Sequence, residues 1–299
     1  MLIPSYLKKG DTIGIVCPSG YMPFEQIKKC IEILTRWGFQ VKLGKTAGSQ
    51  FHYFSGTDAD RLSDLQQMLD DKNTKAILCG RGGYGLSRII DGIDFSAFRT
   101  FPKWIIGYSD ITLLHTHLNS ELKIASLHAP MAAAFNDGEN EFVLSLLKTL
   151  TGKETVYTCG THLLNRIGNA EGELIGGNLS LLVHSIGSAS EVQTENKILF
   201  IEDIGEYIYA TDRMLLQLKR AGKLSDLKAL IAGSFTDMKD TAIPFGQTIY
   251  EAIYDKIKEY NYPVCFDFPV GHTEKNYALK CGMNYQLDVS KNKVSLSSR

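Results

Sequence analysis

The sequence predicts an α/β protein in two parts: an N-terminal domain with a doubly wound parallel sheet of the flavodoxin or Rossmann kind, and a C-terminal α/β domain that ends in a β-hairpin. Two observations predict this class. Short β-branched runs alternate with longer amphipathic stretches from residue 11 to about residue 150, which is the pattern of βαβ units. The segment 283–298, MNYQLDVSKNKVSLSS, alternates apolar and polar residues as the strands of a hairpin do.

The N-terminal elements follow from local sequence patterns. In chain order we expect strands at residues 11–18, 39–44, 74–80, 103–109 and 123–131, and helices at residues 23–38, 58–71, 86–93 and 110–120. The helix at 58–71 has acidic residues in its first turn, and Leu62, Leu65 and Met68 recur at helical spacing. It leads directly into the apolar strand TKAILCG.

A connection between the two domains is expected where periodicity is lost. Residues 151–170 are polar, contain glycines and show no sustained hydrophobic repeat. We therefore expect an N-terminal domain at 1–155, a connection at 156–169 and a C-terminal domain at 170–299. The C-terminal domain should hold strands in ELIGG, KILFIE, LKALIAG and PVCFDF, with helices near TDRMLLQLKRAG and GQTIYEAIYDKIKEY.

Composition limits the partners and the compartment. The chain has 299 residues, 44% hydrophobic and 22% charged, enough to build one or two cores. Its formal charge of −1 provides no field that would concentrate nucleic acid or an anionic membrane surface. Pro4 and the charges after it interrupt any signal-peptide core, and no apolar run reaches spanning length. We expect a cytoplasmic protein with reduced cysteines and neither a nucleic-acid nor a membrane partner.

Ser109 is the first candidate for chemistry. In KWIIGYSDITLL an apolar strand stops at Gly-Tyr-Ser and a helix begins at once, so Ser109 should occupy a tight strand-to-helix turn beside unpaired backbone N–H groups, including that of Asp110. This pattern is close to the nucleophile elbow of hydrolases but has Ile111 where G-x-S-x-G has its last glycine. The alternative is that Ser109 and Asp110 are only a helix cap and a first-turn acid.

A serine nucleophile needs a base, and His272 is the strongest of the seven histidines. FDFPVGHTEK delivers its ring on a loop after an apolar strand, although a functionless surface histidine fits the same pattern. His128, in SLHAPM, could also border the carboxyl edge of the sheet. The others offer less: His115 and His117 lie two apart on one helix and cannot both serve one site, and His52, His162 and His184 are expected to be structural.

KILFIEDIGE provides a carboxylate to orient that base. An apolar strand ends in Glu202 and Asp203, with Glu206 one turn later. A carboxylate at the end of a buried strand is costly without a partner, and an imidazole N–H is a suitable partner. The alternative is an exposed acidic turn, which suits Asp203 and Glu206 better than Glu202.

RGGYG, residues 81–85, follows a strand and precedes a helix, so it should lie at the same sheet edge as Ser109. Its glycines favour a second oxyanion donor at Gly83 or Gly82, with Arg81 or Tyr84 lining the pocket. A phosphate-binding loop is the rival interpretation, but the G-x-G-x-x-G order and a P-loop lysine are missing. No metal-ligand spacing occurs, so we expect neither a metal nor another cofactor.

Together these motifs resemble the LD-carboxypeptidase family, which includes the muramoyltetrapeptide carboxypeptidases and, as a sister branch, the microcin immunity peptidase. The matching stretches, in family order, are CPSG, RGGYG, GYSDIT, GGNLSLL, FIEDIGE followed by DRML, and PVGHT. The resemblance implies a two-domain serine peptidase with Ser109 as nucleophile, Glu202 as acid and His272 as base. It also implies that Asp110 and Gly83 donate the oxyanion-hole N–H groups.

The resemblance further implies a cytoplasmic, metal-free homodimer that removes the terminal D-alanine from murein tetrapeptide by cutting an L,D bond during cell-wall recycling. The microcin branch, which cleaves acyl-sulfamoyl adenylates and related peptidyl nucleotides, is the alternative. We favour the murein branch because the microcin enzymes carry an added loop for which this chain has little room. A non-catalytic α/β module that binds an anion through RGGYG is the alternative from a different class.

Overall fold

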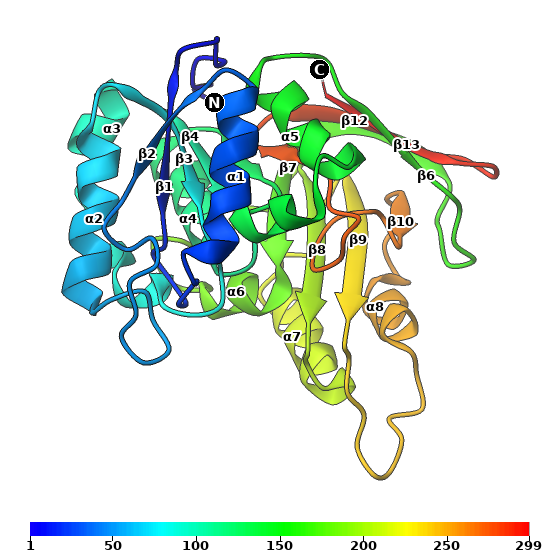
Figure 1. The fold of residues 1–299 in the computed structure, drawn as a ribbon. Coiled ribbons are helices and arrows are strands. Elements are labelled where there is room, and N and C mark those ends of the chain that lie inside the picture. Colours follow the sequence, from blue (N-terminus) through cyan, green and yellow to red (C-terminus); the bar gives the residue numbers. More distant parts are fainter. Residues whose placement is uncertain (299) are drawn as a thin grey trace. The chain divides into compact units, whose positions relative to one another are not determined.

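The computed structural model describes residues 1–298, which divide into two compact units (Figure 1). Unit 1 comprises residues 1–153 and a short returning segment at 277–280, and unit 2 comprises the rest of the described chain. Each unit is built on one β-sheet. The mixed α/β class predicted from the sequence is confirmed.

Unit 1 contains a six-stranded sheet. In spatial order its strands are β11 (Leu279–Cys281), β5 (Ser126–His128), β4 (Trp104–Gly107), β3 (Thr74–Cys79), β1 (Thr12–Val16) and β2 (Gln40–Leu43). The strands from β1 to β5 pair in parallel, and their order 2-1-3-4-5 is that of a flavodoxin-like doubly wound sheet. Ligands in such sheets bind at the carboxyl edge, which is where the loops after β1, β3 and β4 lie.

The helices of unit 1 are α1 (Glu25–Arg36), α2 (Asp58–Asp70), α3 (Ser96–Thr100), α4 (Thr112–His117) and α5 (Glu141–Leu150). The start of α2 is fixed by a capping box, in which Thr57 Oγ1 accepts from the Asp60 N–H and the Asp60 carboxylate accepts from the Thr57 N–H. The helix predicted at 86–93 is wrong. Two single 3₁₀ turns, Leu86–Arg88 and Ile90–Gly92, replace it because Ile89 leaves helical geometry at φ −123°.

Unit 2 contains a seven-stranded mixed sheet. In spatial order its strands are β10 (Val264–Phe266), β9 (Ala229–Thr236), β8 (Ile198–Ile204), β7 (Gly168–Asn178), β12 (Asn284–Val289), β13 (Val294–Ser298) and β6 (Val156–Cys159). The strands from β10 to β7 pair in parallel, and the rest pair antiparallel. The predicted hairpin corresponds to β12 and β13. Strand β6 falls inside the segment expected to be a connection.

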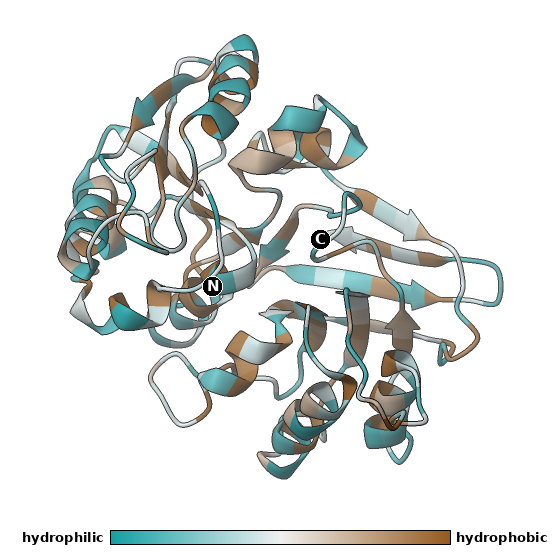
Figure 2. Ribbon diagram, turned by 60° about the horizontal axis from the view of Figure 1, so that its bottom comes forward, coloured by the Kyte–Doolittle hydropathy of each residue, from teal (hydrophilic) through white to brown (hydrophobic). Residues whose placement is uncertain are grey.

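Apolar packing in unit 2 delivers the end of β8 to a buried position. The helices α6 (Leu179–His184), α7 (Ile208–Arg220) and α8 (Ile249–Ile257) contribute to this core, which includes Leu199 and Ile201 of β8. The arrows of β8 and β9 run side by side in Figure 1, and the helices of Figure 2 carry both brown and teal residues, as amphipathic helices do. Across residues 1–298, no helix combines the length and the apolar character needed to cross a membrane.

Candidate active site

Ser109 lies in a sharp turn at the carboxyl end of β4. Tyr108 is extended, Ser109 has φ 64° in the left-handed region, and the 3₁₀ turn Ser109–Ile111 leads into α4. A non-glycine residue in this region is uncommon and is held there by its surroundings. Among residues 1–298, no side-chain hydrogen bond caps either this turn or α4. Ser109 is therefore not a helix cap, and its hydroxyl is presented by a strained strand-to-helix turn.

The glycine loop after β3 lies directly against this turn. A Cβ built on Gly82 would come within 2.7 Å of Ser109 Cβ, 3.0 Å of Ser109 Oγ and 3.3 Å of the Asp110 nitrogen. Only a residue without a side chain fits there. Gly83 has φ 101°, a conformation that also favours glycine. Unit 1 thus brings Ser109, Asp110 and the Gly82-Gly83 backbone together.

The Asp110 side chain holds three loops in register. Its carboxylate is 1% exposed and accepts hydrogen bonds from Ser19 Oγ at 2.6 Å and from the Leu86 N–H at 2.8 Å. The same loops are joined by the Gly20 N–H, which donates to the Gly82 carbonyl at 3.1 Å. Asp110 is thus more than the first-turn acid of the alternative interpretation. Ser19 belongs to the CPSG motif, which was the only sequence signal for its role.

Arg81 and Tyr84 are both exposed on the glycine loop. Arg81 Nη1 donates to the Tyr21 carbonyl at 2.9 Å, which ties the side chain to the loop after β1. The Tyr84 ring lies 6.0 Å, centroid to centroid, from the ring of Phe54. Both side chains therefore belong to the carboxyl edge of the sheet on which Ser109 is presented.

In unit 2, His272 and Glu202 form a hydrogen-bonded pair. His272 Nδ1 lies 2.6 Å from Glu202 Oε2, the Glu202 side chain is 0% exposed and the His272 side chain is 13% exposed. Glu202 reaches this position at the end of the buried run of β8, and His272 reaches it on the loop after β10. His272 is therefore not an exposed loop residue, which was the alternative interpretation of its sequence pattern.

A glycine makes the close approach of the two side chains possible. A Cβ on Gly271, which has φ 120°, would lie 2.8 Å from both Cβ and Oε2 of Glu202. The backbone there is held by the Gly271 N–H, which donates to Asn276 Oδ1 at 3.0 Å, and by Thr236 Oγ1, which donates to the His272 carbonyl at 3.1 Å. The loop therefore sets the imidazole over Glu202 before any ligand binds.

Burial and the Glu202 carboxylate shift the pKa of His272 in opposite directions. Burial lowers the pKa of the imidazole, but the hydrogen bond and the charge of Glu202, with a contribution from Asp203, raise that pKa above its ordinary 6.5. Burial raises the pKa of Glu202, and the bond to His272 opposes the rise. With Nδ1 engaged by Glu202, Nε2 is the ring nitrogen that can exchange a proton with a ligand.

Asp203 corrects part of the sequence interpretation. It was expected to suit an exposed acidic turn, yet it is 2% exposed. Its carboxylate accepts from Asn178 Nδ2 at 2.8 Å, from Ser180 N–H at 3.0 Å and from Ser180 Oγ at 2.7 Å, so it fastens the start of α6 to β8. Glu206, by contrast, is only partly buried. Of the two adjacent acids, Glu202 faces the histidine and Asp203 faces the scaffold.

His128, the other histidine candidate, and His115 on α4 are both buried in the core of unit 1. His128 is fully buried at the end of β5, with its ring 5.7 Å from that of Tyr108. His115 is buried between Ser126 Oγ at 2.9 Å and the Gly107 carbonyl at 2.8 Å, and burial lowers its pKa to about 4. Such a group stays neutral at physiological pH and serves packing.

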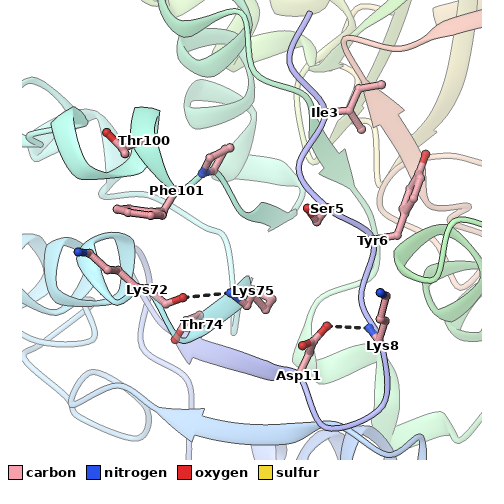
Figure 3. Close-up of a pocket in the computed structure, with 11 residues that line it drawn as sticks. Ile3, Ser5, Tyr6, Lys8, Asp11, Lys72, Thr74, Lys75, Thr100 and Phe101 are labelled. Carbon is pink, nitrogen blue, oxygen red and sulfur yellow. Dashed lines mark hydrogen bonds between the residues drawn. The ribbon is translucent and has the colours of Figure 1, made fainter.

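The described residues contain no metal-ligating cluster, and one pocket of unit 1 lies away from Ser109. Within residues 1–298, no group of three or more His, Cys, Asp and Glu side chains could hold a metal ion. A pocket of about 430 Å³ lies at the amino ends of β1, β3 and β4, the edge opposite Ser109 (Figure 3). Two of its three lysines are directed to other groups: Lys72 Nζ lies 4.7 Å from the ring centroid of Phe101, and Lys75 Nζ donates to the Lys72 carbonyl.

In comparisons with known proteins, both units match domains of one family. Residues 13–129 match the LD-carboxypeptidase N-terminal domain, and residues 171–287 match the LD-carboxypeptidase C-terminal domain. A probable murein peptide carboxypeptidase of Bacillus subtilis is 37% identical over 284 residues, which cover 93% of this chain and 89% of the relative.

Solved structures agree. The muramoyltetrapeptide carboxypeptidase of Oxalobacter formigenes superposes with a TM-score of 0.88 at 28% identity, covering 96% of this chain and 98% of that one. The microcin C7 self-immunity protein MccF, in complex with aspartyl sulfamoyl adenosine, gives a TM-score of 0.88 at 25% identity, covering 100% and 99%. The resemblance seen in the sequence motifs is confirmed. The chain belongs to the LD-carboxypeptidase family of serine peptidases.

Proposed function

We propose that this enzyme hydrolyses the L,D peptide bond before the terminal D-alanine of murein tetrapeptide, with Ser109 as nucleophile, His272 as general base and Glu202 as the acid that orients His272. The names of the Bacillus and Oxalobacter relatives support the murein peptide as substrate. The observation that carries the proposal is the buried contact of 2.6 Å between His272 Nδ1 and Glu202 Oε2. Such a pair has the form of the base and orienting acid of a serine-peptidase triad.

The proposed reaction is acyl transfer in two halves. Ser109 Oγ attacks the scissile carbonyl carbon while His272 Nε2 takes the hydroxyl proton, and the Glu202 carboxylate stabilises the imidazolium. The backbone N–H groups of Asp110 and of Gly83 or Gly82 hold the oxyanion. The C–N bond then breaks as His272 returns its proton to the amino group of the departing D-alanine. Water deprotonated by His272 hydrolyses the ester on Ser109 and restores the enzyme.

Release of D-alanine from purified murein tetrapeptide, beside tripeptide and pentapeptide, tests the substrate directly. We expect mass spectrometry to detect tripeptide and free D-alanine from the tetrapeptide alone. Inert tetrapeptide would overturn the murein proposal.

A second substrate class is favoured by one observation, the likeness to MccF over the whole chain. One solved structure of MccF holds aspartyl sulfamoyl adenosine, so the rival proposal is hydrolysis of an aminoacyl sulfamoyl nucleotide. Incubating the enzyme with aspartyl sulfamoyl adenosine separates the two. Turnover of the nucleotide with inert tetrapeptide would favour the rival class.

The two adjacent acids should differ sharply in importance. We expect Glu202→Gln to lower kcat by about 10⁴-fold, as loss of the orienting acid does in serine-peptidase triads. Asp203→Asn should cost less than about tenfold in kcat, although loss of buried hydrogen bonds should lower the free energy of unfolding by about 1 to 3 kcal/mol. Steady-state kinetics and thermal denaturation of both variants measure these effects. The reverse order of the two kcat losses would show that the acid was misassigned.

The acidic limb of the pH profile should report His272. Because the base must be neutral, kcat/KM should rise with pH through a midpoint above 6.5, the ordinary imidazole pKa. In Glu202→Gln the charge of Glu202 is lost, while burial, which lowers the His272 pKa, and the smaller opposing contribution of Asp203 remain, so the midpoint should move to lower pH. Residual activity of the variant, measured from about pH 5 to about pH 9, gives the comparison. An unmoved midpoint would contradict His272 as the titrating base.

We also propose that the enzyme works in the cytoplasm as a homodimer, as the family resemblance implies. Light scattering of the purified protein should give twice the chain mass. A mass equal to one chain would contradict the dimer.

A further inference from the structure

We propose that Arg81 binds the terminal carboxylate of the peptide substrate and so restricts cleavage to the last peptide bond. This inference rests on the proposed function and assigns the side chain that makes the enzyme an exopeptidase. In a substrate cut before its last residue, only an amide nitrogen and a Cα separate the attacked carbon from the terminal carboxylate carbon. The bond lengths place these two carbons less than about 4.3 Å apart. The carboxylate receptor must therefore lie beside the nucleophile.

Arg81 meets this requirement because the next residue in the chain, Gly82, lies against Ser109. A Cβ on Gly82 would come within 3.0 Å of Ser109 Oγ, so the backbone at residue 82 borders the nucleophile. The Cα of Arg81 is one residue away, about 3.8 Å from the Cα of Gly82. Because an arginine side chain is longer than this separation, its guanidinium can reach a group bound beside Ser109.

The positive charge of the Arg81 guanidinium is not neutralised by a carboxylate of the described residues. The side chain is exposed, and among residues 1–298 it forms no ion pair with a carboxylate. Two other arginines near this sheet edge are already paired, since Arg61 and Arg88 both contact the Asp58 carboxylate. Arg81 is thus available to a carboxylate that arrives with the substrate.

One hydrogen bond sets the direction of the guanidinium. Nη1 donates to the Tyr21 carbonyl at 2.9 Å, which leaves the edge formed by Nε and Nη2 for a ligand. That edge presents two parallel N–H groups, the geometry that binds a carboxylate through both oxygens. Tethering by Tyr21 orders the side chain in advance, so less rotamer freedom is lost when the substrate binds.

The test compares two substrates that differ only at the terminus: the tetrapeptide and the same peptide ending in a carboxamide. The wild-type enzyme should prefer the free carboxylate by on the order of 10- to 100-fold in kcat/KM, the effect of a charge-assisted hydrogen-bonded pair. Arg81→Gln should bring this ratio close to one by slowing only the carboxylate substrate. Arg81→Lys, which keeps the charge but loses the two-pronged geometry, should fall between them.

Arg99→Gln, an exposed arginine on α3 at the opposite edge of the sheet, is the matched control and should keep the wild-type ratio. Circular dichroism and thermal melting of each variant establish that it is folded. An unchanged ratio in Arg81→Gln, or an equal loss on both peptides, would overturn the assignment while the proposed function stands. A wild-type enzyme inert on both peptides would overturn the proposed function and the assignment together.

Discussion

Replacing Ser109 with alanine is expected to lower kcat/KM for D-alanine release by about 10⁵- to 10⁶-fold, the loss seen when a serine-peptidase nucleophile is removed. The variant keeps the backbone N–H groups of Asp110 and the glycine loop, so oxyanion stabilisation and substrate binding should leave a small residual rate above water. The measurement is D-alanine release at limiting tetrapeptide concentration.

Two controls make the loss specific to the Ser109 hydroxyl. A left-handed backbone at φ 64° costs about as much conformational free energy for alanine as for serine. Ser109→Ala should therefore unfold at nearly the wild-type temperature. Ser63→Ala, an exposed serine on α2, should retain full activity. Retention of more than about a hundredth of wild-type kcat/KM by a folded, uncontaminated Ser109→Ala protein would remove Ser109 from the nucleophile role.

Replacing His272 with alanine is expected to produce a loss of similar size, about 10⁵- to 10⁶-fold in kcat/KM. In the proposed mechanism, removing the imidazole leaves the Ser109 hydroxyl without the acceptor of its proton and the departing amino group without its proton donor. The Glu202 carboxylate would also lose its buried partner, so the protein should be less stable by about 1 to 3 kcal/mol. Kinetics beside thermal denaturation separate the two effects.

The matched control for this variant is His184→Ala, because His184 is an exposed histidine on α6 of the same unit. It should keep wild-type activity. A folded His272→Ala enzyme that lost less than about a hundredfold would identify some other group as the general base.

Local patterns predicted the parts of the fold and of the candidate site that depend on short stretches of chain. The apolar run that ends at Gly107, the last residue of β4, and the helix pattern that begins soon after it indicated the turn at Ser109, and the structure has that turn with φ 64°. The apolar run of β8 ending at Glu202 and the strand-loop pattern before His272 indicated an acid and a base. Their contact of 2.6 Å joins residues 70 positions apart.

Features that depend on distant contacts left no local signal. Asp110 bonds to Ser19, 91 residues earlier, and nothing in GYSD distinguishes this buried strut from a first-turn acid. Asp203 looked like an exposed turn residue because its partners, Asn178 and Ser180, come from the preceding strand and helix. Strand β11 is only three residues long, too short for any periodicity to show that the chain returns to the first sheet.

The claim that Ser109 of unit 1 and His272 of unit 2 act as one catalytic group is tested most directly by the double variant Ser109→Ala/His272→Ala. Triad members are strongly non-additive, because removing one already removes the function of the others. The double variant should therefore retain the same residual kcat/KM as either single variant, within about threefold. Losses that multiply, so that the double variant falls far below both single variants and toward the uncatalysed rate, would show that the two residues act independently.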